Sequence, residues 1–270
     1  MTKKNKSAIQ RRLIPTYIFL IIVSFISVFP LYWMISAATN TSTDVSRGRI
    51  IPGSHFMENF RNLTSQQPLW RALGNSFFYA ILTTVICLLI CSIAGYGFEV
   101  YHDKWKDRVF SILLLAMMVP QVATMVPLFK MFSKAGLLNT AVGFILPIIS
   151  TPFMIMMFRQ NARSFPVDII EAARIDGLNE VRIFFQMFIP TMKSTYAAAA
   201  VITFMNAWNS YLWPKVIMTD NKAMTMPMLI ANLITGYVTD YGMLMCGVLF
   251  CSIPTMIVFF VLQKQFAEGI

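Results

Sequence analysis

Long uncharged, apolar segments alternate with short charged ones along this chain of 270 residues. Six segments contain no Asp, Glu, Lys, Arg or His and are each 21 to 31 residues long. The hydrocarbon core of a bilayer, about 30 Å thick, is crossed by about 20 apolar residues of helix. We therefore expect an all-α membrane protein that forms a single transmembrane domain over 1–270. Its six transmembrane helices are predicted over about 13–37, 74–98, 109–129, 140–158, 194–213 and 241–263.

A seventh uncharged segment, 223–239, is 17 residues long and contains Pro227 and Gly236. It is shorter than a typical transmembrane helix, and proline and glycine both weaken a helix. We interpret it as a loop or short helix at the outer mouth of the protein. The alternative is a seventh span, which would place Lys264 on the outside.

The distribution of basic residues predicts the orientation in the membrane. Five of them precede the first span, and Lys and Arg are enriched on the cytoplasmic side of membrane proteins. With six spans, the inside segments hold 14 of the 22 Lys and Arg residues, which favours cytoplasmic N- and C-termini. The first apolar stretch is longer than the apolar region of a signal peptide, about 7–15 residues. We expect it to remain as an uncleaved anchor.

Composition narrows the class of protein further. Hydrophobic residues make up 57% of the chain and charged residues 13%, whereas soluble domains carry about 25% charged residues. This excludes an ordinary soluble enzyme. The net charge of +10 does not indicate nucleic-acid binding, because no basic face remains once the spans are removed. The cysteines all fall inside predicted spans, and His55 and His102 fall on opposite predicted sides, so we expect no disulfide and no metal site.

The predicted spans also lack the groups that drive transport by themselves. Ion-coupled carriers usually hold carboxylates or histidines within the membrane, and none occurs in the six runs. Sodium coupling through backbone and hydroxyl ligands stays open. The chain has no phosphate-binding Gly-x4-Gly-Lys-[Ser/Thr] motif and no catalytic serine or zinc motif. We expect neither an enzyme nor a bound cofactor, so energy for uphill transport must come from outside the chain.

One inside segment, 159–193, holds nine charges and has the pattern of a helix, a break and a second helix. Pro166 suits the start of the first helix, Gly177 its end, and Asn179 the cap of the second. Pro190 is predicted to stop the second helix, which directs Val181, Phe184, Phe185 and Phe188 toward the membrane. The two helices would form an L-shaped docking element; the alternative is a plain solvated loop.

This segment resembles the EAA loop of binding-protein-dependent ABC importers. The similarity is carried by Glu171-Ala172-Ala173-x3-Gly177 and by Ile189-Pro190. Met187 stands where that family has Ile and Ile189 where it has Leu, and both changes keep an apolar residue. A second stretch resembles the carbohydrate-importer branch with its smaller maltose-type permeases: Trp208-Asn209-x-Tyr211-Leu212-Trp213-Pro214. The resemblance extends over nearly the whole chain and implies the type I permease fold.

The resemblance implies a division of labour among several subunits. The coupling segment at 160–192 would insert its first helix into a separate ATPase subunit that binds ATP. The residues implied in this contact are Glu171, Ala172, Ala173, Arg174, Asp176 and Gly177. The implied partners are a second, non-identical permease, two ATPase subunits and an extracytoplasmic sugar-binding protein. The complex would lie in the bacterial inner membrane, in contact with lipid and not with nucleic acid.

Polar and aromatic residues at the end of the fifth span are candidates for the substrate path, because sugars are bound by neutral polar groups and aromatic faces. They are Asn206, Trp208, Asn209 and Trp213. Asn206, Asn209 and Trp213 would share one helix face. An interfacial aromatic belt and helix-packing asparagines are the alternatives. Asn75, Gln121, Thr124 and Ser150 are interpreted as packing contacts.

These observations predict a permease subunit of an ATP-driven, binding-protein-dependent importer of a carbohydrate, such as an oligosaccharide. An importer for another solute, such as a polyamine or a phosphate ester, is the alternative within the same class. An autonomous channel or an ion-driven carrier is the alternative from another class.

Overall fold

A computed structural model describes residues 3–235 and 239–267 of the chain, with side chains described for 13–235 and 239–261. Within these residues the regular structure is entirely helical. The longer helices are α1 (Lys3–Ala38), α3 (Phe56–Gln66), α4 (Leu69–Val100), α5 (Lys104–Ala116), α6 (Gln121–Lys134), α8 (Pro152–Ala162), α9 (Val167–Ile175), α12 (Lys193–Trp208), α14 (Met226–Ile234) and α15 (Tyr241–Ala267). The shorter ones are α2 (Ser42–Ser46), α7 (Ala141–Ile145), α10 (Glu180–Ile183), α11 (Ile189–Thr191) and α13 (Leu212–Ile217), with a π-helix at Phe184–Phe188 and a 3-10 turn at Asn221–Ala223.

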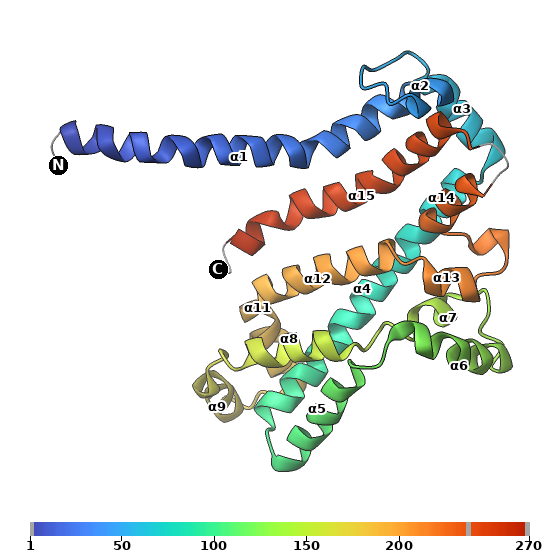
Figure 1. Ribbon diagram of the computed structural model, residues 1–270. Coiled ribbons are helices and arrows are strands. Elements are labelled where there is room, and N and C mark those ends of the chain that lie inside the picture. Colours follow the sequence, from blue (N-terminus) through green and yellow to red (C-terminus); the bar gives the residue numbers. More distant parts are fainter. Residues whose placement is uncertain (1–2, 236–238, 268–270) are drawn as a thin grey trace. The chain divides into compact units, whose positions relative to one another are not determined.

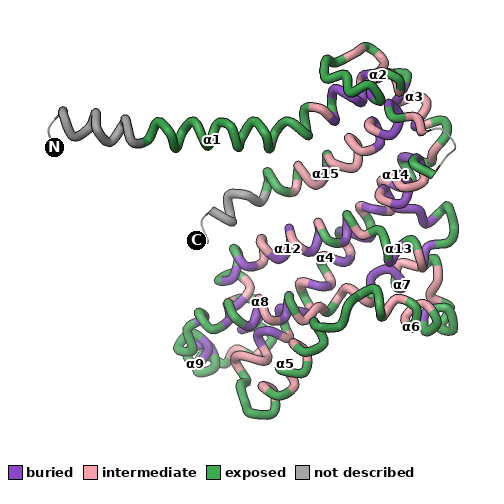
Figure 2. The backbone as a smooth tube through the Cα atoms, viewed as in Figure 1, coloured by how far each residue is buried: buried purple, intermediate pink, exposed green. Residues whose placement is uncertain are grey.

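The chain divides into two compact units. Unit 1 comprises Met1–Gln67 and Asn232–Phe250, and unit 2 comprises Pro68–Ala231 and Cys251–Ile270. In unit 1, the apolar side chains of α1 are exposed between residues 13 and 32, which suits a helix surrounded by lipid or by another subunit (Figure 2). The end of α1 is fixed instead by polar contacts, since Asn59 Nδ2 donates to the carbonyls of Ala38 and Asn40 at 2.9 Å each.

Helix α4 is the centre of unit 2 and packs against α8 and α12 (Figure 1). Small residues on α4 allow these close approaches: Cys87, Cys91, Ser92 and Gly95 are all buried. At Gly95 a Cβ atom would lie 2.6 Å from Phe158 Cβ and 2.7 Å from the backbone nitrogen of Arg159, so only glycine fits against α8. Cys87 and Cys91 share an apolar cluster with residues of α8 and α12: Met154, Ile155, Phe158 and Ala199.

Among the described residues, three helices are long and apolar enough to cross a membrane: Leu13–Ala38, Leu69–Val100 and Tyr241–Val261. These stretches contain or overlap the spans expected at 13–37, 74–98 and 241–263. Helix α14 has nine residues, too short to cross about 30 Å of hydrocarbon.

The other three expected spans are interrupted. At 109–129 the chain forms a bent pair, with α5 and α6 at 100° to each other, rather than one straight helix. Pro120 has extended backbone angles and precedes α6. A proline also disfavours helical backbone at the residue before it, here Val119, which lies between the two helices. Over 140–158, α7 ends at Ile145 and α8 begins only at Pro152. Over 194–213, α12 ends at Trp208 and α13 begins at Leu212.

Candidate functional site

The coupling segment folds as two short helices joined by a tight turn, as the sequence predicts. Helix α9 runs from Val167 to Ile175, and Gly177 follows with a φ of 78°, in the left-handed region that glycine adopts without strain. The Asn179 side chain caps α10 by accepting a hydrogen bond from the Arg182 backbone nitrogen at 2.9 Å. The helix, break and helix are thus confirmed, together with the Asn179 cap.

Helix α9 is seated on an apolar cluster of unit 2 through one face. Ile170 and Ala173 are 2% and 3% exposed, and their spacing of three residues places them on the same side of the helix. The cluster beneath them also contains Tyr96, Ala162, Phe165, Ile183, Phe184, Phe188 and Met192. Ala173, which the resemblance implies in the contact with the ATPase, therefore packs inside this chain.

The opposite face of α9 is open to a partner. Glu171 and Ala172 are exposed, as are the apolar Val167 and Ile175, the latter at 86%. On the following helical stretch Phe184 and Phe188 are buried but Val181 and Phe185 are exposed, so the four do not share one buried face. The segment thus presents acidic, small and apolar side chains together, a surface suited to docking against protein.

Arg174 points back within the segment. Its Nε atom donates to Glu180 Oε1 at 2.7 Å, an ion pair across the Gly177 turn. This pairing lowers the pKa of Glu180 and raises that of Arg174, and burial together with Glu180 raises the pKa of Tyr101 nearby. Asp176 forms the C-cap of α9 and is exposed. Arg174 therefore holds α9 against α10.

Pro190 does not stop the helical path. The chain continues through the π-helix into α11, where Pro190 occupies an early helical position, and it turns only at Met192 before α12. A proline is tolerated there because its missing N–H would have no partner in a first turn.

The second candidate region of unit 2 is a cavity of about 750 Å³ beside the ends of α5 and α12. Asn206 and Asn209 line it and are exposed. The remaining lining residues are Ala116, Val119, Gln121, Thr124, Pro147, Ile148, Thr151, Pro152, Ser210, Tyr211, Leu212 and Trp213. Among the residues lining this cavity none is Asp, Glu, Lys, Arg or His, so it offers neutral hydrogen-bonding groups and two aromatic rings.

The structure brings together three of the four expected path residues, but by a different geometry. Asn209 forms the C-cap of α12 and Trp213 belongs to α13, so Asn206, Asn209 and Trp213 line one cavity across a break rather than along one helix face. Asn209 Nδ2 donates to the Met205 carbonyl at 2.9 Å. Trp213 is buried and its Nε1 donates to the Gly143 carbonyl at 3.1 Å.

Trp208 does not line this cavity. It is 1% exposed, its ring stacks with Phe204 and meets Phe77 edge-on, and its Nε1 donates to the Cys251 carbonyl at 3.0 Å. Its surroundings therefore give it packing contacts within unit 2.

Two residues interpreted as packing contacts turn out to line the cavity. Gln121 and Thr124 lie at the start of α6, and Thr151, Ser210 and Tyr211 supply further hydroxyl groups to the wall. The helix break at Pro120 is the sequence signal that could have identified Gln121, because an interrupted membrane helix opens backbone and side chains toward a cavity. Asn75, by contrast, donates to the carbonyls of Lys222 and Met224 and fixes a loop.

Comparison with known proteins identifies the class. Residues 88–270 match the family described as "Binding-protein-dependent transport system inner membrane component", and the chain belongs to this family. It is thus a multi-pass inner-membrane permease of an ABC importer, a non-enzymatic component that assembles with ATPase and binding-protein components. In the part of the chain that the structure describes, no three metal-ligating side chains come together.

Individual relatives are similar over nearly their full length. The lactose transport system permease protein LacG of Rhizobium radiobacter is 40% identical over 265 residues, covering 97% of each chain. The arabinooligosaccharides transport system permease protein AraQ of Halalkalibacterium halodurans is 36% identical and covers 92% of this chain and 91% of its own. The sn-glycerol-3-phosphate transport system permease protein UgpE of Escherichia coli is 31% identical, covering 90% of each.

The same fold occurs in a solved structure. A chain of a bacterial ABC transporter involved in the import of the acidic polysaccharide alginate superimposes with a TM-score of 0.82 at 20% identity. The match covers 98% of this chain and 99% of the other, so the fold is that of an ABC importer transmembrane subunit.

Proposed function

We propose that this chain is a permease subunit of an ATP-driven importer of a neutral carbohydrate, and that the cavity of unit 2 is its share of the translocation path. The observation that carries the proposal is the lining of that cavity: Asn206, Asn209, Gln121 and Thr124 supply neutral polar groups, and Tyr211 an aromatic ring. Sugar hydroxyls form hydrogen bonds with such neutral groups and need no charged partner. The lactose and arabinooligosaccharide permeases among the relatives support this cargo.

In this proposal the chain crosses the membrane six times and forms half of the path. The bent pair α5–α6 supplies one span, and the interrupted stretches 140–158 and 194–213 supply two more. Broken helices are tolerated at membrane depth where they line a cavity, as these do. Both termini lie in the cytoplasm. The other half of the path belongs to a second, non-identical permease, and two ATPase subunits and an extracytoplasmic sugar-binding protein complete the complex.

The exposed face of α9 is the proposed contact with the ATPase. Glu171 and Ala172 lie on that face, Gly177 sets the turn behind it, and Ala173 and Arg174 hold the helix in place from within. When the ATPase subunits close on ATP, α9 moves and the helices attached to it follow. Glu171→Lys should leave the complex assembled but uncouple ATP hydrolysis from transport. Normal uptake by this variant at wild-type abundance would refute the assignment.

A phosphate ester is the second candidate cargo, because the sn-glycerol-3-phosphate permease is also a relative. The cavity argues against it, since its lining has no Lys or Arg to neutralise a phosphate. The deciding experiment is ligand identification on the cognate binding protein, followed by uptake into proteoliposomes that hold the complete complex. A neutral sugar as ligand supports the proposal, whereas a phosphorylated ligand would overturn it.

A further inference from the structure

A buried arginine lies at the end of α8, just before the coupling segment. Arg159 is 5% exposed, although it follows an uncharged run of 24 residues. A guanidinium group is removed from water at a high cost unless carboxylates and hydrogen bonds compensate it. Its partners therefore indicate what it holds together.

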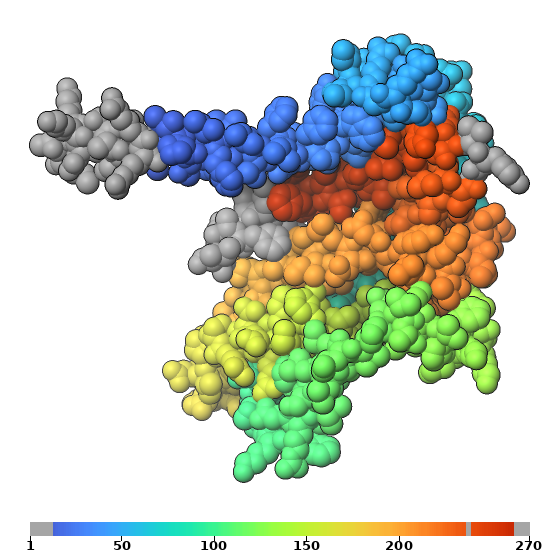
Figure 3. Space-filling view, viewed as in Figure 1, coloured from blue at the N-terminus to red at the C-terminus, as the bar shows by residue number. Residues whose placement is uncertain are grey.

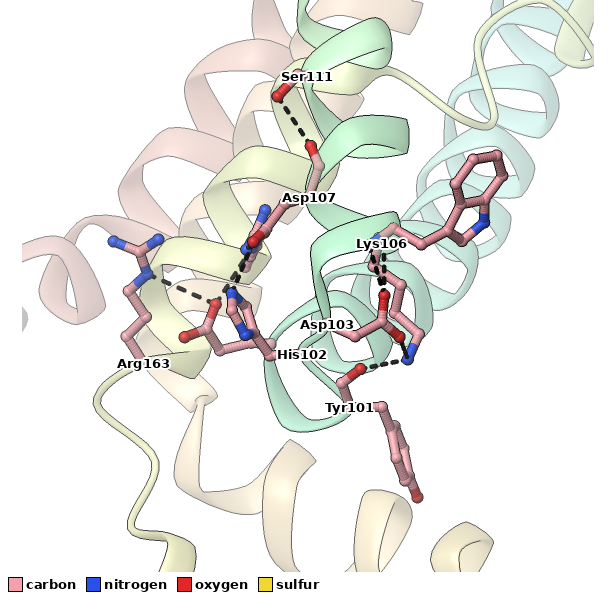
Figure 4. A network of polar contacts seen from close by, with 10 residues as sticks. Tyr101, His102, Asp103, Lys106, Asp107, Ser111 and Arg163 are labelled. Atoms are coloured by element: carbon pink, nitrogen blue, oxygen red, sulfur yellow. Dashed lines mark hydrogen bonds and ion pairs between the residues drawn. The ribbon is translucent and has the colours of Figure 1, made fainter.

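Arg159 binds two carboxylates from two other helices. Its Nε donates to Glu99 Oε2 at 3.2 Å, and its Nη2 donates to Asp107 Oδ1 at 2.6 Å. The guanidinium also lies over the Phe110 ring, 4.4 Å from its centroid. Figure 4 shows Asp107 with His102 beside it, and His102 Nε2 lies 2.9 Å from the second oxygen of Asp107. The pairing with Arg159, followed by the nearby His102, lowers the pKa of Asp107 and keeps it ionised.

The two carboxylates differ in what else holds their helices to α8. Glu99 is on α4, which already packs tightly on α8 through Gly95. Asp107 is on α5, none of whose 13 residues is buried. The space-filling view shows α5 in green directly beside α8 in yellow-green (Figure 3). Apart from Phe110 and Leu113, which pack against the cluster that contains Phe158 of α8, α5 is held to α8 by the Arg159–Asp107 pair. This pair is therefore a larger part of the hold of α5 on α8 than Glu99 is of the hold of α4.

This pair lies between the coupling segment and the cavity wall. Helix α8 leads within a few residues into α9, which begins at Val167. At its other end, α5 finishes at Ala116, and Ala116 and Val119 line the cavity. The contact between Arg159 and Asp107 thus connects α8 to the helix whose end lines the cavity.

We propose that Arg159 is a positioning residue that fastens the α5 wall of the cavity to α8 through Asp107, so that this wall follows the coupling segment. The proposal rests on the proposed function, since it assumes that the coupling segment moves with ATP. The proposal concerns the α5 wall and not the α12 wall, which supplies Asn206. Among the ion pairs and hydrogen bonds of the described residues, Asp107 has no partner on α12.

Two single-cysteine reporters test this in the assembled transporter: Ala116→Cys on the α5 wall and Asn206→Cys on α12. Their reaction rates with a maleimide are measured in proteoliposomes without nucleotide and after trapping with ATP and vanadate. Labelling of the complex without an added cysteine gives the background from the native thiols. In the wild-type background, trapping should change the rate at both positions.

Asp107→Asn should reduce the change in labelling rate on trapping at position 116 about ten-fold or more. A ten-fold change in an equilibrium corresponds to the loss of about one charge-assisted hydrogen bond. The change in labelling rate at position 206 should stay intact. Glu99→Gln is the matched control and should preserve both responses. A normal response at 116 in Asp107→Asn would overturn the proposal, and so would a joint loss at 116 and 206. If trapping changes neither position in the wild-type background, the proposed ATP coupling itself fails, and the proposal fails with it.

Arg159→Lys keeps the positive charge but cannot bridge two carboxylates with a planar fork. Arg159→Lys replaces Asp107→Asn as the test variant if Asp107→Asn reduces the amount of assembled complex, which is measured by co-purification with the ATPase. The same selective loss at 116 is expected, and an unchanged response at 116 would again contradict the proposal. His102→Gln should preserve the labelling response at position 116, because His102 contacts the other oxygen of Asp107.

Discussion

The coupling segment and the cavity belong to the same unit but are built from opposite chemistry. The coupling segment has ionised side chains at its surface, exposed Val167 and Ile175, and a closed apolar cluster beneath. The cavity has neutral amides, hydroxyls and aromatic rings, and no Asp, Glu, Lys, Arg or His among its lining residues. One region suits docking against protein, and the other suits contact with a neutral, hydroxyl-rich solute.

In the proposed function, this difference separates the place where the subunit receives energy from the place where it handles cargo. Charge is useful where a soluble partner must be recognised, and costly where a cavity lies at membrane depth. Between the two regions lie closely packed helices, α4 with α8 and α12, and the buried Arg159. Changes at the coupling segment should therefore uncouple transport, changes at the contact between the helices should destabilise the protein, and changes at the cavity should weaken substrate binding.

The largest effect is expected at Gly177. With a φ of 78°, this residue adopts a conformation that costs an L-residue about 1–2 kcal/mol, and more for a β-branched one. Gly177→Val should therefore change the angle between α9 and α10. We expect transport to fall at least ten-fold while the ATPase still co-purifies, measured as uptake per ATP hydrolysed in proteoliposomes.

Gly177→Asn is the matched control, because asparagine tolerates the left-handed conformation better than other non-glycine residues. No atom lies within 4 Å of a Cβ placed at Gly177, so backbone conformation alone distinguishes the two variants. Equal transport by the valine and asparagine variants would show that the turn does not set the coupling geometry.

A substitution at the helix contact should lower stability before it affects coupling or substrate binding. In Gly95→Ala the new methyl would lie 2.6 Å from Phe158 Cβ, and such overpacking typically costs about 1–3 kcal/mol. The midpoint of thermal unfolding in detergent should fall. Gly97→Ala, on the same helix with nothing within 4 Å of its Cβ, is the control and should be neutral or stabilising. A drop of the same size for both variants would contradict the close approach of α4 and α8.

At the cavity a smaller and more selective effect is expected. Asn206→Ala removes a neutral hydrogen-bonding group, worth about 0.5–1.5 kcal/mol, and should raise the KM for uptake by a few-fold to about ten-fold. Trp208→Phe is the comparison: it removes the bond to the Cys251 carbonyl and should lower stability without changing KM. If Trp208→Phe raises KM and Asn206→Ala does not, the cavity is not the substrate path.

Much of the coupling segment could be predicted from the sequence, because its signals are local. Gly177 and Asn179 define a turn and a cap through the conformations that these residues favour, whatever surrounds them. The direction of Ala173 could not be predicted, since it depends on packing in a cluster that includes Tyr96, which lies far away in the chain. The same holds for the cavity: the breaks at Pro120 and Pro152 are visible in the sequence, but their convergence with Asn206 depends on how the helices pack.

The contacts of Arg159 could not be predicted from the sequence for the same reason. Glu99 and Asp107 lie near the two ends of a short charged loop in the sequence, and Arg159 follows 52 residues after Asp107. Hydropathy places all three at span ends, where exposed charges are usual. Only the packing of α4, α5 and α8 shows that one of them is buried and paired.

The smallest effect is expected at the ion pair between Arg174 and Glu180, which is partly exposed on both sides. Arg174 lowers the pKa of Glu180 in the folded protein, so the pair stabilises the fold fully above the ordinary pKa of a glutamate, about 4.3. That contribution is lost as the pH falls through the lowered pKa of Glu180. The difference in unfolding free energy between wild type and Glu180→Gln should thus be small at neutral pH and vanish in acid. A difference between wild type and Glu180→Gln that grows in acid would mean that Glu180 is stabilised in its protonated form, and that Arg174 does not hold the two helices together.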